Sequence, residues 1–502
     1  MKYVFVNSNY IFTLYYNRML LTLIFSVLFS TLAALHFISV DNTRVLKLLG
    51  LCSSGLVLIL SCLLLIYFDC NFYYFQNMIT YKTNVNLLNL DFTFGLDGIS
   101  ILFFSLSSFL IFLCIIFVLN AELLKEFLIS LTLINLLLLL IFSALDLLIF
   151  YVFFEAVLIP MSLLIGLWGS RERKVRAFYL FFFYTLVGSL LMLLGILYIH
   201  IKTGSSSLEY LLTWNFTLEE QCWLWLSFFI SFASKVPVFP FHIWLPEAHV
   251  EAPTVGSVLL AGIMLKLGVY GFVRFSLTLF PEACLFFSPL VYLLCVTGVI
   301  YASLCAIRQT DLKRIVAYSS VAHMNLVILG AFSFNIIGLE GCLLQSISHG
   351  FVSSAMFFII GTLYERYHSR LVYYYGGLVH MMPVYSILFL IFTMANIALP
   401  GTSSFVGEFL LLTGIYKTNI VCCIVGTTGV ILCGAYSLWL YNRIVFGNLR
   451  VAYTKKFQDV SFREFTVLMP LVIFVFITGI FPSFFLDFMH LSAATSIVIN
   501  FY

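Results

Sequence analysis

Long apolar segments recur from one end of the chain to the other, and they constrain its fold more than any other feature. A helix that crosses a bilayer needs about 20 predominantly apolar residues. Of the 502 residues, 62% are hydrophobic and only 9% are charged. The sequence therefore predicts an all-α integral membrane protein. We expect about fourteen transmembrane helices, near 19–40, 47–68, 98–119, 127–145, 148–168, 176–200, 222–243, 254–280, 285–307, 313–336, 340–363, 383–416, 420–446 and 465–490.

Lys and Arg gather in alternate loops between these segments. They are concentrated in 171–176, 307–314, 364–370 and 443–463, and the intervening loops are poorer in basic residues. Basic loops lie on the cytoplasmic or matrix side of a membrane. The alternation therefore supports the count of fourteen helices and returns both termini to the opposite side.

Two of the expected helices contain residues that interrupt a helix. Pro237 and Pro240 fall in the seventh helix, and Pro400 and Gly401 fall in the middle of the twelfth. A proline inside a helix removes a hydrogen bond and clashes with the carbonyl four residues earlier. Irregular backbone at membrane depth is tolerated only where it is enclosed by protein or lines a watery cavity. We therefore expect helices 7 and 12 to be broken and to face a wet interior.

The two breaks lie five helices apart. This spacing is expected for two five-helix repeats of inverted topology, in which paired broken helices mark an ion pathway. We therefore divide the chain into helices 1–3 at 1–120, a first inverted repeat of helices 4–8 at 121–282, a second of helices 9–13 at 283–450, and a C-terminal loop with helix 14 at 451–502.

Four ionisable side chains lie well inside expected helices: Glu155, Lys235, Lys266 and Glu408. Each charged side chain at the membrane centre costs about 2.5–3.5 kcal/mol on insertion scales. Burial favours the neutral form of a lysine, and a nearby carboxylate restores the charged form. A pair such as Glu155 and Lys235 can therefore act as a proton switch. The alternative is a fixed ion pair that holds helices together.

Two histidines, His323 and His349, lie on consecutive helices between Lys266 and Glu408 in the sequence. Imidazole can take up or release a proton at either nitrogen. The two histidines are therefore candidates for carrying protons between the lysine and the glutamate. The alternative is that they only form hydrogen bonds across helices.

Other kinds of site find no support in the sequence. The twelve cysteines contain no C-x-x-C, so neither a zinc site nor an iron–sulfur site is indicated. There is no G-x-G-x-x-G and no P-loop, and no basic patch suits nucleic acid. We expect no cofactor, metal or nucleic acid to bind this chain.

Six segments carry a family resemblance. They read FGLDGIS (94–100), FFEAVLIPMSLLIGLWG (153–169), SKVPVFPFHIWLPEAHVEAPTVGSVLLAGIMLKLGVYG (234–271), DLKRIVAYSSVAHMN (311–325), SHGFVSSAMFFIIG (348–361) and ANIALPGTSSFVGEFLLL (395–412). In this order they resemble the antiporter-like membrane subunits of respiratory complex I. Residues 1–90 and the tail after about 450 lie outside the resemblance.

The resemblance implies a role for the chain and for its buried polar residues. It implies proton translocation driven by NADH:ubiquinone electron transfer elsewhere in the complex. The acid at Glu408 distinguishes the chain from family members that carry lysine there. The residues that match the family's proton relay are Glu155, Lys235, Lys266, His323, His349 and Glu408.

The resemblance also implies partners and a location. The neighbours would be other membrane subunits of complex I, antiporter-like subunits 2 and 5 among them. NADH, FMN, iron–sulfur clusters and ubiquinone would be used by other subunits. The 55 Phe and 28 Tyr suggest an AT-rich organellar genome, so we expect the mitochondrial inner membrane, with a bacterial plasma membrane as the alternative. Two other functions stay open: a subunit of a multisubunit cation/proton antiporter, and a passive membrane scaffold.

Overall fold

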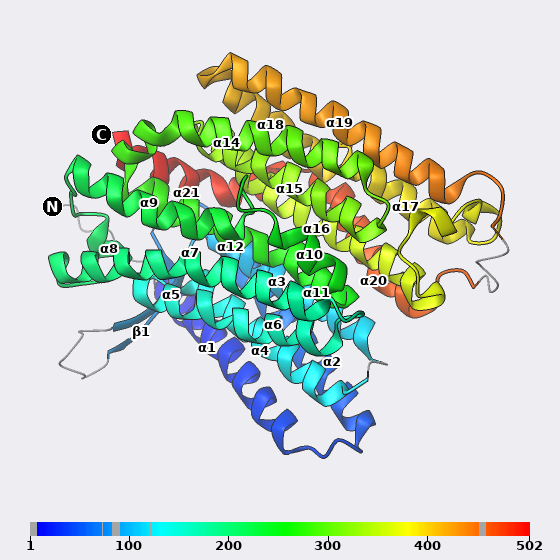
Figure 1. The fold of residues 1–502 in the computed structure, drawn as a ribbon. Coiled ribbons are helices and arrows are strands. Elements are labelled where there is room, and N and C mark those ends of the chain that lie inside the picture. The colour runs from blue at the N-terminus through cyan, green and yellow to red at the C-terminus, as the bar shows by residue number, and fades with distance from the viewer. Residues whose placement is uncertain (1–7, 73, 83–90, 120–121, 451–457, 502) are drawn as a thin grey trace. The chain divides into compact units, whose positions relative to one another are not determined.

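The protein is described by a computed structural model that covers residues 8–72, 74–82, 91–119, 122–450 and 458–501. Its contacts divide it into two compact units. Unit 1 consists of 1–161 and 193–215, and unit 2 consists of 162–192 and 216–502. Figure 1 shows the elements in chain order.

Unit 1 is a helical bundle with one β-hairpin. Helix α1 packs against α2 and α4, α3 packs against α2 and α4, and α4 also packs against α5. Strands β1 and β2 pair antiparallel, a hairpin that the sequence analysis did not predict. The bounds are α1 Ser8–Phe37, α2 Thr43–Ile66, β1 Gln76–Lys82, β2 Asp91–Leu96, α3 Gly98–Val118, α4 Leu124–Ser143, α5 Leu147–Ala156 and α8 Leu208–Leu211. Helices α6 (Leu158–Trp168) and α7 (Lys174–Thr203) have residues in both units.

Unit 2 contains the remaining helices. Their bounds are α9 Leu218–Lys235, α10 Trp244–Glu251, α11 Thr254–Leu259, α12 Leu265–Gly271, α13 Leu277–Leu279, α14 Pro281–Arg308, α15 Leu312–Ala331, α16 Ile336–Tyr367, α17 Pro383–Asn396, α18 Ser403–Thr418, α19 Ile420–Val445, α20 Phe462–Ile480 and α21 Ser483–Phe501. Two π-helical turns, η1 (Leu260–Met264) and η2 (Phe272–Ser276), join α11, α12 and α13, and two 3₁₀ turns, η3 (Val372–Tyr374) and η4 (Leu378–His380), precede α17.

The described residues form twelve helices that are long and apolar enough to cross a membrane. The two expected spans missing from this set are the seventh and the twelfth, and both are divided. Helix α9 ends at Lys235 before α10 begins, and α17 ends at Asn396 before α18 begins. The prediction of about fourteen spans with two broken helices is therefore confirmed. The repeat boundaries proposed above stay a prediction.

The structure divides the last expected helix into two. A single helix was predicted over 465–490, whereas α20 ends at Ile480 and α21 begins at Ser483. Pro482 lies between them. Because proline has no N–H and its ring clashes with the preceding turn, the chain ends one helix and starts another there.

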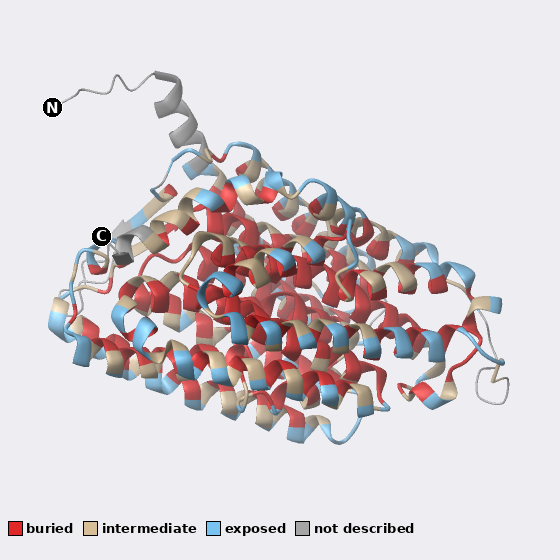
Figure 2. Cartoon of the chain, turned by 90° about the horizontal axis from the view of Figure 1, so that it is seen from above, coloured by how far each residue is buried: buried red, intermediate tan, exposed pale blue. Residues whose placement is uncertain are grey.

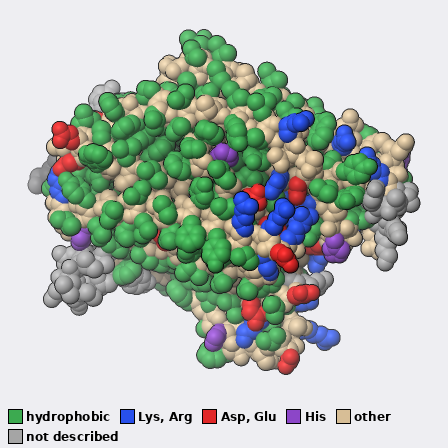
Figure 3. Space-filling view, viewed as in Figure 1, with side chains coloured by type: hydrophobic (Ala, Val, Ile, Leu, Met, Phe, Trp, Pro, Cys, Tyr) green, Lys and Arg blue, Asp and Glu red, His purple; other side chains and the backbone are tan. Residues whose placement is uncertain are grey.

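The most enclosed helices of unit 2 are those in its centre. The most apolar stretches of Thr254–Leu279 and α16 are completely buried, compared with 39% for α14. Figure 2 shows this red interior, and Figure 3 shows hydrophobic side chains over most of the face in view. Helix α16 packs against α15 and α18, and a Cβ on Gly414 of α18 would lie 2.4 Å from the Cα of Gly338 of α16. Glycine at this crossing lets the two backbones meet directly.

Candidate functional site

The first helix break directly follows Lys235, which is buried and is the last residue of α9. The N–H of Val238 donates to the carbonyl of Ala233 at 3.0 Å. The indole of Trp244 donates to the carbonyl of Ser234 at 2.8 Å. The carbonyl that the proline frees thus receives a new donor. The break therefore places the lysine at a helix end whose nearby carbonyls are partly satisfied by the protein itself.

The second break, after Asn396, has the same pattern of hydrogen bonds. The N–H of Leu399 donates to the carbonyl of Met394 at 3.1 Å. The hydroxyl of Ser404 donates to the carbonyl of Ala395. In both breaks an N–H three residues past the helix end reaches back five residues, and a later side chain bonds the penultimate carbonyl of the helix. This correspondence is expected for two related repeats.

Gly401 gives the second break its turn. Its φ is +92°, a left-handed conformation that glycine adopts without steric strain. Asn396 in this break occupies the place that Lys235 occupies in the first, because each is the last residue of its helix. The first break therefore presents a titratable side chain, and the second presents an amide.

Lys266 lies in α12, directly after the π-helical turn η1, and is completely buried. Its Nζ donates to the carbonyl of Ala261 at 2.5 Å and lies 2.9 Å from Nδ1 of His349 on α16. π-Helical turns are rare and are frequent at functional sites. Here the turn supplies a backbone acceptor that holds the lysine head group beside the imidazole.

The two histidines continue from Lys266 toward Glu408. The ring centroids of His349 and His323, on α16 and α15, are 5.8 Å apart. Nδ1 of His323 lies 3.0 Å from Oε1 of Glu408 on α18. All four residues are at most 7% exposed. Four residues from four helices thus form a row of buried titratable groups in unit 2, in which the two imidazole rings lie side by side in the middle.

Three polar residues that lie beside this row were not predicted from the sequence. Nε2 of Gln345 on α16 donates to Oε1 of Glu408 at 3.1 Å. Sγ of Cys433 on α19 lies 3.6 Å from Nε2 of His323, and the hydroxyl of Tyr436 donates to that sulfur at 3.0 Å. A small cavity of about 10 Å³ is lined by His323, Glu408, Cys433 and Tyr436 among others, which is room for about one water molecule.

The two remaining candidates belong to different units. Glu155 lies on α5 in unit 1, one residue before that helix ends, and Lys235 lies in unit 2. Their predicted pairing stays a prediction.

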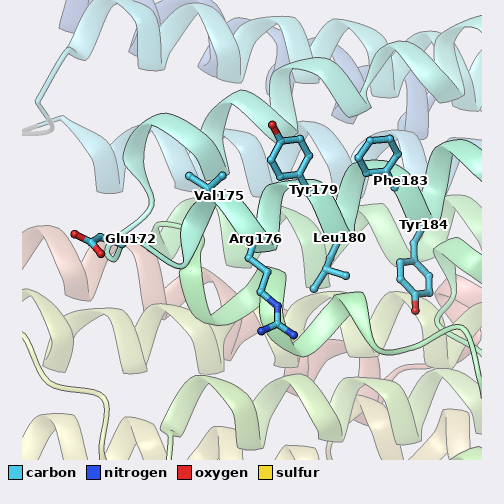
Figure 4. Close-up of a pocket in the computed structure, with 7 residues that line it drawn as sticks. All are labelled: Glu172, Val175, Arg176, Tyr179, Leu180, Phe183 and Tyr184. Atoms are coloured by element: carbon cyan, nitrogen blue, oxygen red, sulfur yellow. The ribbon is translucent and has the colours of Figure 1, made fainter.

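The described part of the chain shows no candidate metal centre. Its His, Cys, Asp and Glu side chains form no group of three or more that could hold a metal ion. A surface hollow of about 560 Å³ lies along the start of α7 (Figure 4) and contains no candidate relay residue. It is lined by Glu172, Val175, Arg176, Tyr179, Leu180, Phe183 and Tyr184.

Comparison with known proteins identifies the family of the chain. Residues 144–433 match the family described as NADH:quinone oxidoreductase/Mrp antiporter, TM. This range includes all six candidate relay residues, and it defines the class as an antiporter-type membrane protein. The chain is 51% identical over 462 residues to NADH-ubiquinone oxidoreductase chain 4 of Arabidopsis thaliana, covering 92% of this chain and 93% of the relative. It is 54% identical over 408 residues to the protein of that name from Marchantia polymorpha, covering 81% and 82%. The chain therefore belongs to the NADH-ubiquinone oxidoreductase chain 4 family.

Solved structures share the fold. A chain of respiratory complex I from Thermus thermophilus with bound NADH is 31% identical, with a TM-score of 0.86, covering 96% of this chain and 99% of that one. A chain of the Mrp complex from Dietzia sp. DQ12-45-1b is 18% identical, with a TM-score of 0.83, covering 96% and 97%. The second likeness concerns the fold alone.

Proposed function

We propose that this chain is a proton-translocating membrane subunit of NADH:ubiquinone oxidoreductase, and that protons move along its row of buried side chains. The observation that carries the proposal is the connection of Lys266, through two histidines, to Glu408 inside the most enclosed helices of unit 2. Ionisable groups are rare in membrane segments, and those present mark ion and proton pathways. The kinship with chain 4 proteins supports the same reading.

The steps follow from the distances. Lys266 releases a proton to Nδ1 of His349 across 2.9 Å. The proton crosses from His349 to His323 across the gap between the rings, through one water or by movement of an imidazole. His323 exchanges it with Glu408 across 3.0 Å. Each step transfers one proton between groups that can both give and take it, so the row returns to its starting state after a full passage.

Protons would reach Lys266 from Lys235, with Glu155 as the partner that sets the charge of that lysine. Separation of a carboxylate from a lysine weakens the protonated form, and approach strengthens it. In this proposal the Glu155–Lys235 distance gates entry to the row, and the helix break after Lys235 gives that lysine freedom to move.

The energy comes from elsewhere in the complex. We place NADH oxidation, FMN, the iron–sulfur clusters and ubiquinone reduction in other subunits, and we expect antiporter-like subunits 2 and 5 as membrane neighbours. The chain is a multi-pass membrane protein. We place it in the mitochondrial inner membrane, because the relatives from Arabidopsis thaliana and Marchantia polymorpha are eukaryotic proteins of the same family.

A pair of substitutions at Lys266 tests the proposal. Lys266→Met removes the proton carrier, and Lys266→Arg keeps a positive charge that does not deprotonate in proteins. We expect both variants, in purified complex reconstituted into liposomes, to lose NADH-driven proton transport while the chain stays in the complex. A fixed structural cation would be replaced by arginine, so transport restored by Lys266→Arg contradicts the relay.

Two further measurements separate the alternative functions. A cation/proton antiporter exchanges sodium for protons without NADH, so proton transport that needs a sodium gradient and no NADH contradicts the proposal. A passive scaffold keeps its transport when the row is interrupted. Lys266→Met with wild-type transport and full assembly would establish that role instead.

A further inference from the structure

We propose that Cys433 is a positioning residue that biases His323 toward the tautomer with its hydrogen on Nε2. By accepting a hydrogen bond from Nε2–H, its sulfur keeps Nδ1 open for proton exchange with Glu408. This inference rests on the function proposed above and adds a residue to it. Cys433 lies on α19, outside the row itself, and its side chain is buried.

The second helix break determines where the thiol hydrogen of Cys433 points. Because α17 ends at Asn396, the carbonyl of Asn396 has no partner further along its own helix and accepts the S–H of Cys433 at 3.3 Å. With its hydrogen committed there, the sulfur acts as an acceptor. The hydroxyl of Tyr436 donates to it at 3.0 Å, and the side-chain amide of Asn396 does so at 3.7 Å.

The sulfur therefore faces the imidazole as an acceptor. Nε2 of His323 lies 3.6 Å from Sγ and must carry the hydrogen that this contact uses. In the neutral ring the other nitrogen is then bare, and that nitrogen, Nδ1, is the one 3.0 Å from Glu408. A proton arriving at Nδ1 is at once within hydrogen-bond distance of the carboxylate.

Without the sulfur, the neutral ring has a competing state. Its hydrogen can move to Nδ1 and bond to the Glu408 carboxylate, which holds the ring in a charge-assisted hydrogen bond. That state offers no empty nitrogen toward the glutamate. The thiol contact stabilises only the state with the hydrogen on Nε2, and it shifts the balance between the two states by the strength of one weak N–H···S hydrogen bond.

The titratable groups around His323 come from three neighbouring helices. In the described chain they are Glu408 of α18, His349 of α16, and Cys433 with Tyr436 of α19, and Lys266 lies behind His349. Helix α14 contributes the apolar Val299 to the same small cavity. Substitution of the thiol leaves the other titratable groups in place, so a change in the proton affinity of His323 can be attributed to the loss of the sulfur.

The test is the pH profile of NADH-driven proton transport by the reconstituted complex, from about pH 6 to pH 9. Cys433→Ala and Cys433→Val both remove the acceptor, and valine also fills the space of the thiol. For both we expect the alkaline limb to move by about half a pH unit to lower pH, a roughly threefold loss of proton affinity. Cys433→Ser keeps an acceptor, and we expect the wild-type profile.

Cys423 provides the matched control. It lies on the same helix, and its thiol donates to the carbonyl of Leu412 at 3.4 Å. Cys423→Ala should leave the profile unchanged. The inference is overturned if Cys433→Val restores the wild-type profile, since packing would then suffice, or if Cys433→Ala leaves the profile in place. Neither result touches the proposed function, which fails separately if Lys266→Met retains transport.

Discussion

Replacing Glu408 with glutamine removes the last proton acceptor of the row while keeping the shape of the side chain. Oε1 of Glu408 lies 3.0 Å from Nδ1 of His323 and accepts a hydrogen bond from Nε2 of Gln345 at 3.1 Å. The carbonyl oxygen of glutamine can still accept from Gln345, and from Nδ1 of His323 when that nitrogen carries a proton. Glutamine carries no charge and takes up no proton, so the substitution isolates the ionisation of residue 408 from its packing.

The magnitude follows from the kinds of hydrogen bond involved. A hydrogen bond to a charged group contributes about 1.5–3 kcal/mol, and one between neutral groups about 0.5–1.5 kcal/mol. Glu408→Gln therefore weakens the protonated form of His323 by about 1–1.5 kcal/mol, which is close to a tenfold loss of its proton affinity. Because the terminal acceptor is also lost, we expect the rate of proton transport to fall by at least about tenfold.

The assay is NADH-driven proton transport into liposomes that contain the purified complex, with the amount of assembled chain measured in parallel. Glu340 offers a matched control: its Oε1 lies 2.5 Å from Nδ1 of His490, whose side chain is 63% exposed. Glu340→Gln removes a glutamate–histidine pair of the same chemistry outside the row. We expect wild-type transport from it. Wild-type transport by an assembled Glu408→Gln complex would refute the reasoning, as would an equal loss in both variants.

Three further substitutions have distinct expected outcomes. Gln345→Leu removes the amide that donates to Glu408 and should slow transport severalfold in the same assay, less than Glu408→Gln does, because residue 408 can still take up a proton. Asp459 accepts the N–H groups of Val384 and Tyr385 at 2.9 and 3.1 Å at the start of α17, so Asp459→Ala should cost about 1 kcal/mol and lower the melting temperature of the complex. Arg366→Ala removes the bidentate partner of the Glu464 carboxylate, which lies 2.7 Å from Nη2 and is 5% exposed. The expected loss of about 3–5 kcal/mol of folding stability should deplete the chain from the assembled complex on an immunoblot.

The helix breaks and the main ionisable residues could be predicted because each carries a cost that is visible in the sequence. A proline inside an apolar segment has one structural meaning, and a lysine or glutamate there needs a partner. The contacts among Lys266, His349, His323 and Glu408 could not be predicted in the same way. A sequence indicates which residues share a face of one helix, but it does not indicate which face of a neighbouring helix packs against them. These four residues come from four helices, so their contacts depend on that packing.

The missed residues of the site are those that carry no such cost. Gln345 is not ionisable, although its place four residues before His349 puts both on one face of α16. Cys433 reads as a small apolar residue in an apolar helix. Tyr436, three residues later, shares its face, so a polar pair on α19 was the available signal. The division of the last helix at Pro482 could likewise be predicted from the sequence, because a proline ends a helix at the preceding residue.

The two breaks also explain why the row is asymmetric. Both end a helix with the same backbone hydrogen bonds, yet the first places Lys235 at the helix end and the second places Asn396 there. An amide cannot take up a proton near neutral pH, so the titratable group of the second half must come from elsewhere. Glu408, in the second turn of α18, fills that role. The carbonyl freed at Asn396 is then available to orient the Cys433 thiol, and through it His323. The first break thus places a proton carrier, Lys235, at a helix end. The second break instead supplies a carbonyl that helps to orient the contacts of His323.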